Sequence, residues 1–147
     1  MKRFLIMSHG HMASGIKSSV EILTGPCEAI TAIDCYVDDS DYVPAVRDFI
    51  EGGAEGDESV IFTDILGGSV FQKVIQERPE VHGVMHVTGT NLAVVIECLL
   101  TGDRLTPEKV SEIATQASGQ LKLITIDEGR NDGDPSDVAA QENDFFA

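Results

Sequence analysis

Two short polar segments, each directly after an apolar run, carry the residue types that phosphoryl transfer needs. The first is Ser8-His9-Gly10, and the second begins at Asp64 and ends in Gly67-Gly68-Ser69. A neutral imidazole is an abundant nucleophile near pH 7, because an unperturbed histidine side chain has a pKa of about 6.5. A carboxylate bonded to Nδ1 fixes the tautomer, leaves Nε2 free to attack phosphorus and stabilises the positive charge that develops on the ring. We therefore predict His9 as a nucleophile and Asp64 as the residue that orients it.

The same two segments also predict a site for the phosphate itself. Each leads into a helical pattern, and the free N–H groups and positive dipole end of a helix favour an anion. Gly10, Gly67 and Gly68 permit a close approach of the backbone, and Ser69 can donate a hydroxyl group. Thr63 is a further candidate contact, although a β-branched residue at the end of a strand is also expected for structural reasons alone. No GxxxxGK[ST] or GxGxxG motif is present, so nucleotide binding is not predicted.

Apolar runs alternate with helical patterns along the chain. We expect strands over residues 4–7, 29–36, 59–63, 84–87 and 120–126. Helices are expected over about 12–23, 43–50, 70–77, 92–100 and 107–117, with Asn91 and Thr106 as N-caps of the last two.

Strands that are apolar throughout are buried on both faces, which predicts an α/β fold with an open, mostly parallel, doubly wound sheet. About five strands in the order 2-1-3-4-5 are expected, the last of them parallel or antiparallel, with helices on both faces. Ligands of such sheets bind beyond the carboxyl ends of the strands, where the winding direction reverses. In this order that crevice lies between the first and third strands, so the topology brings His9 and Asp64 towards each other.

Length and charge limit the classes of function. The 147 residues fit a single domain, which we place at residues 1–126, and the net charge of −15 disfavours nucleic acid and anionic membranes as partners. Residues 127–147 contribute six of these negative charges and are predicted to be a flexible acidic tail. Three cysteines without a CxxC spacing indicate reduced thiols in the cytoplasm. No signal peptide or membrane insertion is predicted, and the sequence suggests no cofactor and no metal ion.

Three segments together resemble a known family. They are SHG after the first strand, FTDILGGSVF at residues 62–71 and VTGTNLAVVIECL at residues 87–99. In this order and spacing they are similar to the enzyme IIA domain of the mannose-type sugar phosphotransferase system, over residues 4 to about 126. The resemblance implies a flavodoxin-like sheet, a homodimer and a phosphotransferase with a phosphohistidine intermediate. His9 would accept a phosphoryl group from phospho-HPr and pass it to an enzyme IIB, in support of sugar uptake. It also implies that Asp64 orients His9 and that Ser69 lines the phosphate pocket.

The chain departs from the family pattern at two positions. The family often has proline after GGS, where this chain has Val70, and often a bulky residue after SHG, where it has His11. Val70 can alter the start of the helix, and His11 changes the polarity near the nucleophile without replacing it. No IIB domain follows, and the acidic tail does not resemble the family's Ala/Pro-rich linker. We therefore expect a free-standing enzyme IIA.

A histidine phosphatase or mutase is one alternative, because these enzymes also place a histidine at the end of their first strand. They use an Arg-His-Gly setting and a second catalytic histidine. Here Ser8 stands in place of the arginine, and His82 and His86 are more simply explained as a loop residue and a satisfied core residue.

Two further alternatives use the same residues. His9, His11 and Asp64 offer nitrogen and oxygen ligands for a metal ion, although positions i and i+2 at a helix start diverge. A binding module that senses the phosphorylation of its partners, and has a regulatory role, would have the same sequence features.

Overall fold

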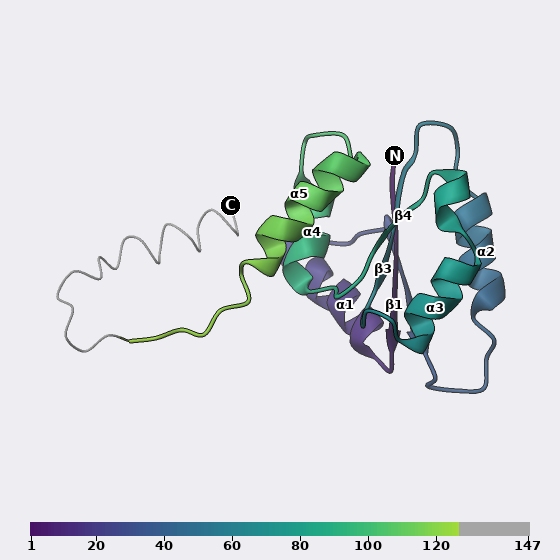
Figure 1. Ribbon diagram of the computed structural model, residues 1–147, viewed down its shortest axis with the longest axis horizontal. Coiled ribbons are helices and arrows are strands. Elements are labelled where there is room, and N and C mark those ends of the chain that lie inside the picture. The colour runs from purple at the N-terminus through teal and green to yellow at the C-terminus, as the bar shows by residue number, and fades with distance from the viewer. Residues whose placement is uncertain (127–147) are drawn as a thin grey trace.

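The computed structural model describes residues 1–126 of the chain (Figure 1). The elements within this range, in chain order, are β1 (Lys2–His9), α1 (Met12–Thr24), β2 (Ile30–Cys35), α2 (Val43–Glu51), β3 (Glu58–Thr63), α3 (Ser69–Gln76), a short 3-10 helix η1 (Pro79–His82), β4 (Met85–Val87), α4 (Leu92–Leu100) and α5 (Pro107–Ser118). Four of the five predicted strands and all five predicted helices are therefore present. The predicted tail at residues 127–147 lies outside the described residues.

The four strands form one parallel sheet in the order β2-β1-β3-β4. Ile6 of β1 pairs with Ala32 of β2 on one side and with Phe62 of β3 on the other. The predicted α/β fold, with its order 2-1-3-4 and its parallel strands, is confirmed. The winding direction reverses between β1 and β3, so the loops after these two strands meet at the carboxyl edge of the sheet.

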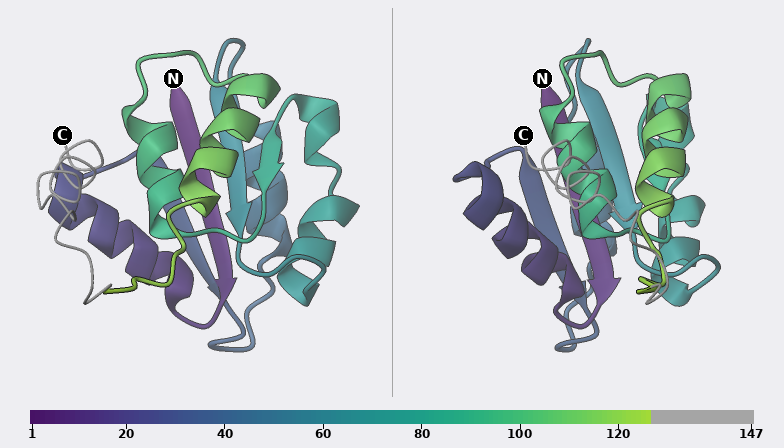
Figure 2. Two further views of the ribbon diagram at one scale, coloured as in Figure 1. Left: turned by 60° about the vertical axis from the view of Figure 1, so that its left-hand side comes forward. Right: turned by 90° about the vertical axis from the view of Figure 1, so that its left-hand side faces the viewer.

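Helices cover both faces of the sheet because side chains alternate along β1. Phe4 and Ile6 pack in one core cluster with residues of α1, α4 and α5. Leu5 and Met7 point the other way and pack with residues of α2 and α3. Figure 1 shows α1, α4 and α5 on one side of the strands and α2 and α3 on the other, and Figure 2 shows α4 and α5 in front of the sheet. This double burial fixes the register of β1 and with it the position of His9.

Both predicted N-caps are confirmed. Asn91 accepts a hydrogen bond from the N–H of Val94, and Thr106 accepts one from the N–H of Lys109. Each bond satisfies one of the N–H groups that a helix start leaves without an intrahelical partner. These caps define where α4 and α5 begin.

The fifth strand predicted over Gln120–Ile126 does not form. Residues 121–126 have no strand pairing, and they leave the end of α5 and run away from the sheet (Figure 1). Leu121, Leu123 and Ile126 are each exposed over 88% or more of their surface. The alternating apolar pattern is that of a strand, but a strand must pair with a sheet edge, and residues 121–126 pair with neither β2 nor β4.

None of the helices in residues 1–126 combines the length and the apolar character needed to span a bilayer.

Candidate functional site

His9 is the last residue of β1 and lies where the chain turns towards α1. The hydroxyl group of the buried Ser8 accepts a hydrogen bond from the N–H of Ala13 at 2.7 Å, which ties the start of α1 to the end of β1. Gly10 has a φ of +61° and donates its N–H to the carbonyl oxygen of Cys35 on β2 at 2.9 Å. A left-handed conformation of this kind favours glycine, so the SHG segment is first of all a backbone arrangement that presents His9 at the sheet edge.

Asp64, directly after β3, holds His9 at two points. Its Oδ2 accepts hydrogen bonds from the backbone N–H of His9 at 2.7 Å and from Nδ1 at 2.8 Å. Because a carboxylate only accepts, Nδ1 carries the proton and Nε2 has the free lone pair. The histidine side chain is 42% exposed and the aspartate side chain is 7% exposed. The geometry thus joins a shielded carboxylate to an accessible nucleophilic nitrogen, and it brings the two residues together as the topology predicts.

The charge of Asp64 is favoured by its hydrogen bonds. Burial on its own would raise the pKa of this carboxyl group. The N–H and ring of His9, together with the N–H of Ile65 at 2.9 Å, outweigh burial and hold the pKa below its ordinary value. Asp64 is therefore ionised at neutral pH and can stabilise a positive charge on the imidazole.

Ser69 lies on the other side of the ring, at the first position of α3. Its Oγ is 3.1 Å from Nε2 of His9. The start of α3 has no side-chain cap, so the N–H groups of its first turn remain available and the positive end of the helix dipole faces the same region. A phosphoryl group on Nε2 would lie beside this hydroxyl group and the helix start.

Gly67 and Gly68 shape the turn between Asp64 and Ser69. Gly67 has a φ of +77°, which favours glycine. A Cβ atom on Gly68 would lie 3.3 Å from the carbonyl oxygen of Ile65 and 3.6 Å from Cε1 of His9, so the backbone passes close to the ring here. Glycine is thus favoured at position 67 by the backbone conformation and at position 68 by the close approach of the backbone to neighbouring atoms.

Thr63 is buried completely and points away from the open side of the site. Its hydroxyl group makes hydrogen bonds to Nε2 of His86 at 2.8 Å and to the hydroxyl group of Thr88 at 2.9 Å. Its carbonyl oxygen accepts bonds from the N–H and the hydroxyl group of Thr90. A contact between Thr63 and a phosphate would require the hydroxyl bonds to break, and it stays a prediction. The TGTN segment at residues 88–91 supports the end of β3 from behind the site.

Tyr36 belongs to the site although the sequence pattern did not indicate it. Its hydroxyl group donates to Oγ of Ser69 at 2.9 Å, and its ring centroid lies 5.3 Å from that of His9 with the planes tilted by 33°. Tyr42 makes a hydrogen bond with the Tyr36 hydroxyl group at 3.0 Å. No motif or periodicity identifies Tyr36. The residue follows β2 and has a φ of +65°, which is unusual for a bulky residue and which the sequence does not indicate.

Exposed apolar side chains occur on the segments that adjoin the nucleophile. They come from the start of α1 and from the loops after β2 and β3, and they are Met12, Tyr36, Val37, Ile65 and Leu66. Exposed apolar groups that gather on three neighbouring segments around a reactive residue are typical of a surface that contacts another protein.

The other histidines lie in different surroundings. His11 is exposed, and its Nδ1 lies 3.0 Å from Oδ2 of Asp34. His86 is half-buried, and burial lowers the pKa of its imidazole. In residues 1–126 no group of three or more His, Cys, Asp or Glu side chains is arranged to hold a metal ion. The metal alternative thus finds no cluster in this range, since His11 pairs with Asp34 and not with His9.

The phosphatase alternative requires a cationic clamp beside the histidine. Each arginine within residues 1–126 is engaged elsewhere, as shown by the pairs Arg3 with Phe49 and Ser59, Arg47 with Glu77, Arg78 with Glu80, and Arg104 with Gly56. The described part of the chain therefore supplies no arginine to the His9 site.

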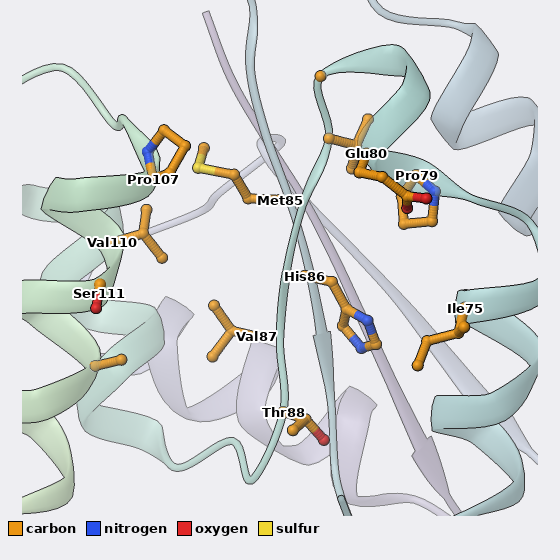
Figure 3. A pocket seen from close by; sticks show the side chains of 13 residues that line it. Ile75, Pro79, Glu80, Met85, His86, Val87, Thr88, Pro107, Val110 and Ser111 are labelled. Carbon is orange, nitrogen blue, oxygen red and sulfur yellow. The ribbon is translucent and has the colours of Figure 1, made fainter. Parts of the chain in front are cut away.

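An apolar groove of about 570 Å³ runs along the outer edge of β4, between α5 and the α3–η1 segment (Figure 3). Met85 and Val87 face Pro107 and Val110 of α5, while His86 points towards Ile75 of α3. His9, Asp64 and Ser69 do not line this groove. It is a second feature of the molecule, separate from the candidate site.

The fold is similar to those of proteins with solved structures. A sugar phosphotransferase system protein of Klebsiella pneumoniae, described as a permease, superposes with a TM-score of 0.72 at 27% identity, covering 83% of this chain and 90% of its own. The mannose/sorbose-specific IIA subunit of Enterococcus faecalis superposes with a TM-score of 0.69 at 22% identity, covering 87% and 98%. The IIA protein associated with the fucose utilization operon of Streptococcus pneumoniae gives 0.68 at 21% identity, covering 83% and 92%. At these last two identities the likeness shows the fold.

The comparison with curated proteins gives no significant match. The profile of one protein family, the fructose IIA component of the phosphotransferase system, matches residues 3–115. This range contains the whole sheet except Lys2 of β1, and it contains His9 and Asp64. With more than half of its length matched, the chain belongs to the mannose-type enzyme IIA family of the sugar phosphotransferase system.

Proposed function

We propose that this protein is a cytoplasmic phosphocarrier in which His9 accepts a phosphoryl group from phospho-HPr and passes it to an enzyme IIB, in support of sugar uptake. One observation carries the proposal. Nδ1 of His9 is held by Asp64 at 2.8 Å, while Nε2 lies at an exposed position 3.1 Å from Ser69 and beside the uncapped start of α3. Members of the enzyme IIA family are phosphotransferases, and an oriented histidine beside an anion site suits this reaction.

In the first step the lone pair of Nε2 attacks the phosphorus of the donor phosphohistidine. The nitrogen–phosphorus bond of the donor breaks as the new bond to Nε2 forms, so the donor imidazole recovers its lone pair. The proton on Nδ1 stays in place, and the ring of His9 takes up a positive charge, which Asp64 stabilises. The hydroxyl group of Ser69 and the first N–H groups of α3 are placed to hold the oxygens of the transferred group. Transfer to the enzyme IIB repeats this step in reverse.

The proposal that both partners are proteins rests on the exposed apolar side chains around His9. Their contact would remove water from the two histidines during transfer, which strengthens the electrostatic interactions in the site. Ile65 and Leu66, both highly exposed, lie next to Asp64 and would meet a partner first.

We also propose a homodimer, because two unpartnered features complement each other. Residues 121–126 expose their apolar side chains, and β4 leaves its outer edge open beside an apolar groove. An open strand edge presents backbone groups that can pair with another strand. Both features are satisfied if residues 121–126 of one copy add to β4 of the other copy.

Incubation with phospho-HPr tests the carrier function. Mass spectrometry should find one added phosphoryl group, which is released by acid and stable to base, and addition of an enzyme IIB should remove it. His9→Ala should abolish the label, while His11→Ala and His86→Ala serve as matched controls that keep it. A label that survives in His9→Ala would reject the site.

A further inference from the structure

Tyr36 has a backbone conformation that needs compensation. Its φ of +65° is one of two positive values at non-glycine residues within residues 1–126. Such a conformation is unfavourable for a bulky L-residue, and it persists where surrounding contacts over-determine it, which occurs often at functional sites. The side chain is 56% exposed, so burial is not what holds it. The contacts of Tyr36 with the candidate site are therefore what can hold this backbone conformation.

These contacts form a chain of hydrogen bonds that ends at the nucleophile. Nε2 of His9 accepts, because its neighbour Nδ1 donates to Asp64. Ser69 therefore gives its only proton to Nε2 and accepts from the hydroxyl group of Tyr36. Tyr36, having given its proton to Ser69, accepts from Tyr42. All the protons in this chain point in one direction, and such a series polarises each of its members.

The protonation of Tyr42 supports this direction. Burial, followed by the hydrogen bond that Tyr42 donates to Tyr36, raises the pKa of the Tyr42 phenol. Tyr42 therefore remains a donor over the whole neutral range of pH. The ring of Tyr42 also packs edge-on against that of Tyr36, with centroids 5.8 Å apart. Tyr42 thus fixes Tyr36 through both its ring and its hydroxyl group.

Phosphorylation changes what Ser69 must do. Once Nε2 is bonded to phosphorus it has no lone pair, so the proton of Ser69 turns to an oxygen of the phosphoryl group. Tyr36 donates to one of the two lone pairs of the Ser69 oxygen, which orients the hydroxyl group so that its proton can be donated in both states. The Tyr36 ring meanwhile lies beside the imidazole and limits the approach of water to that side.

We propose that Tyr36 is a positioning residue for phosphoryl transfer, which orients the Ser69 hydroxyl group towards Nε2 and the phosphoryl oxygens and shields the imidazole with its ring. This inference rests on the proposed phosphocarrier function. It assigns separate tasks to the two parts of one side chain: the hydroxyl group acts on the rate of transfer, and the ring acts on the lifetime of the phosphohistidine.

Two variants separate these tasks. Tyr36→Phe keeps the ring and removes the hydroxyl group, and it should lower the rate of transfer from phospho-HPr by about tenfold, as expected for the loss of one hydrogen bond in the transition state. Tyr36→Gly removes both and relieves the backbone, and it should also shorten the lifetime of the phosphohistidine at least about threefold. Ser40→Ala, at an exposed position of the same loop and outside the apolar surface, is the matched control and should leave both quantities unchanged. Circular dichroism establishes that each variant is folded.

A nitrogen NMR spectrum of the unphosphorylated protein gives a readout that a merely structural role would not move. In Tyr36→Phe the Nε2 resonance of His9 should move towards that of an imidazole nitrogen without a hydrogen bond. Phosphoramidate serves as a small donor that does not depend on HPr. If phospho-HPr fails to label wild-type protein, the proposed function is lost, and the NMR and phosphoramidate measurements still decide the role of Tyr36. An unchanged Nε2 resonance together with wild-type transfer in Tyr36→Phe would overturn that role.

Discussion

Oδ2 of Asp64 accepts hydrogen bonds from both the side chain and the backbone of His9, at 2.8 Å and 2.7 Å. One oxygen atom of Asp64 thus fixes both the tautomer of the His9 ring and the position of the His9 backbone. His9 ends β1 and Asp64 directly follows the neighbouring strand β3, so the hydrogen bonds join the ends of these two parallel strands. Any change at this atom should therefore affect both the chemistry of the site and the stability of the sheet edge.

Asp64→Asn should lower the rate of phosphoryl transfer by roughly 10- to 100-fold. A hydrogen bond to a charged group is worth about 1.5–3 kcal/mol, and the neutral amide no longer stabilises the positive imidazole that forms during transfer. Rapid-quench measurements with phospho-HPr provide the rate. Asp34→Asn is the matched control, because Asp34 makes the equivalent bond to His11 and should leave transfer within about twofold of wild type. Equal losses in both variants would contradict the assignment.

The stability of the protein should fall in acid partly through Asp64. Its folded-state pKa lies below the ordinary value of 3.8, so its contribution is complete above that value and is lost as the pH falls through the folded-state pKa. Urea unfolding at pH 7 and at about pH 3 should show a smaller loss in Asp64→Asn than in wild type. Other aspartates with lowered pKa values, such as Asp34 and Asp57, are common to both proteins and cancel in this difference. An identical loss in the two proteins would refute the prediction.

Gly10→Ala and Gly15→Ala should change stability in opposite directions. Gly10 has a φ of +61° with open space around its Cβ position, so alanine there should cost about 1–2 kcal/mol of backbone strain. Gly15 lies on the exposed side of α1 without a positive φ, and alanine there should stabilise the helix by about 0.5–1 kcal/mol. Chemical unfolding of the two variants measures both effects. Two changes of the same sign would be inconsistent with this reading of the SHG turn.

The three cysteines should differ in their reactivity towards a thiol reagent. Burial raises the pKa of both Cys35 and Cys98 to about 11, so at pH 8 only about one thiol in a thousand is ionised at these positions. Cys27 is half-buried and should be modified first. The time course of modification with Ellman's reagent, before and after addition of denaturant, measures the difference. Cys27→Ser should remove the fast phase. A fast phase that persists in this variant would contradict the prediction that Cys27 is modified first.

Leu123→Asp should convert the proposed homodimer to a monomer. Leu123 is 88% exposed in a single copy, so the charge would have little effect there, whereas it would be costly in an apolar groove of a second copy. Light scattering after gel filtration gives the mass. Lys122→Asp, at the neighbouring position of the alternating pattern, is the control. A wild-type protein that is monomeric at all concentrations would exclude the dimer.

The sequence predicted what depends on local pattern and on rules of chain topology. The apolar runs at 4–7 and 59–63 identified two central strands, and the order of strands brought His9 and Asp64 together without any distance being known. The phosphoryl roles of these residues stay predictions until they are measured.

Two features could not be predicted, for different physical reasons. The left-handed conformation of Tyr36 is accompanied by contacts with Tyr42, at the far end of the same loop, and with Ser69, which is distant in the sequence, so no local signal marks it. Residues 120–126 have the pattern of a strand, but pairing requires a free edge, and a pattern in one segment carries no information about which edge, in which copy, is available.

His9 stands at the rim of the sheet with nearly half of its side chain in contact with solvent. An isolated copy of this protein therefore has an open site, and in the proposed function each partner protein would close it. In the proposed function, the donor and the acceptor must therefore both fit the surface around His9, because both exchange the phosphoryl group at the same Nε2 atom.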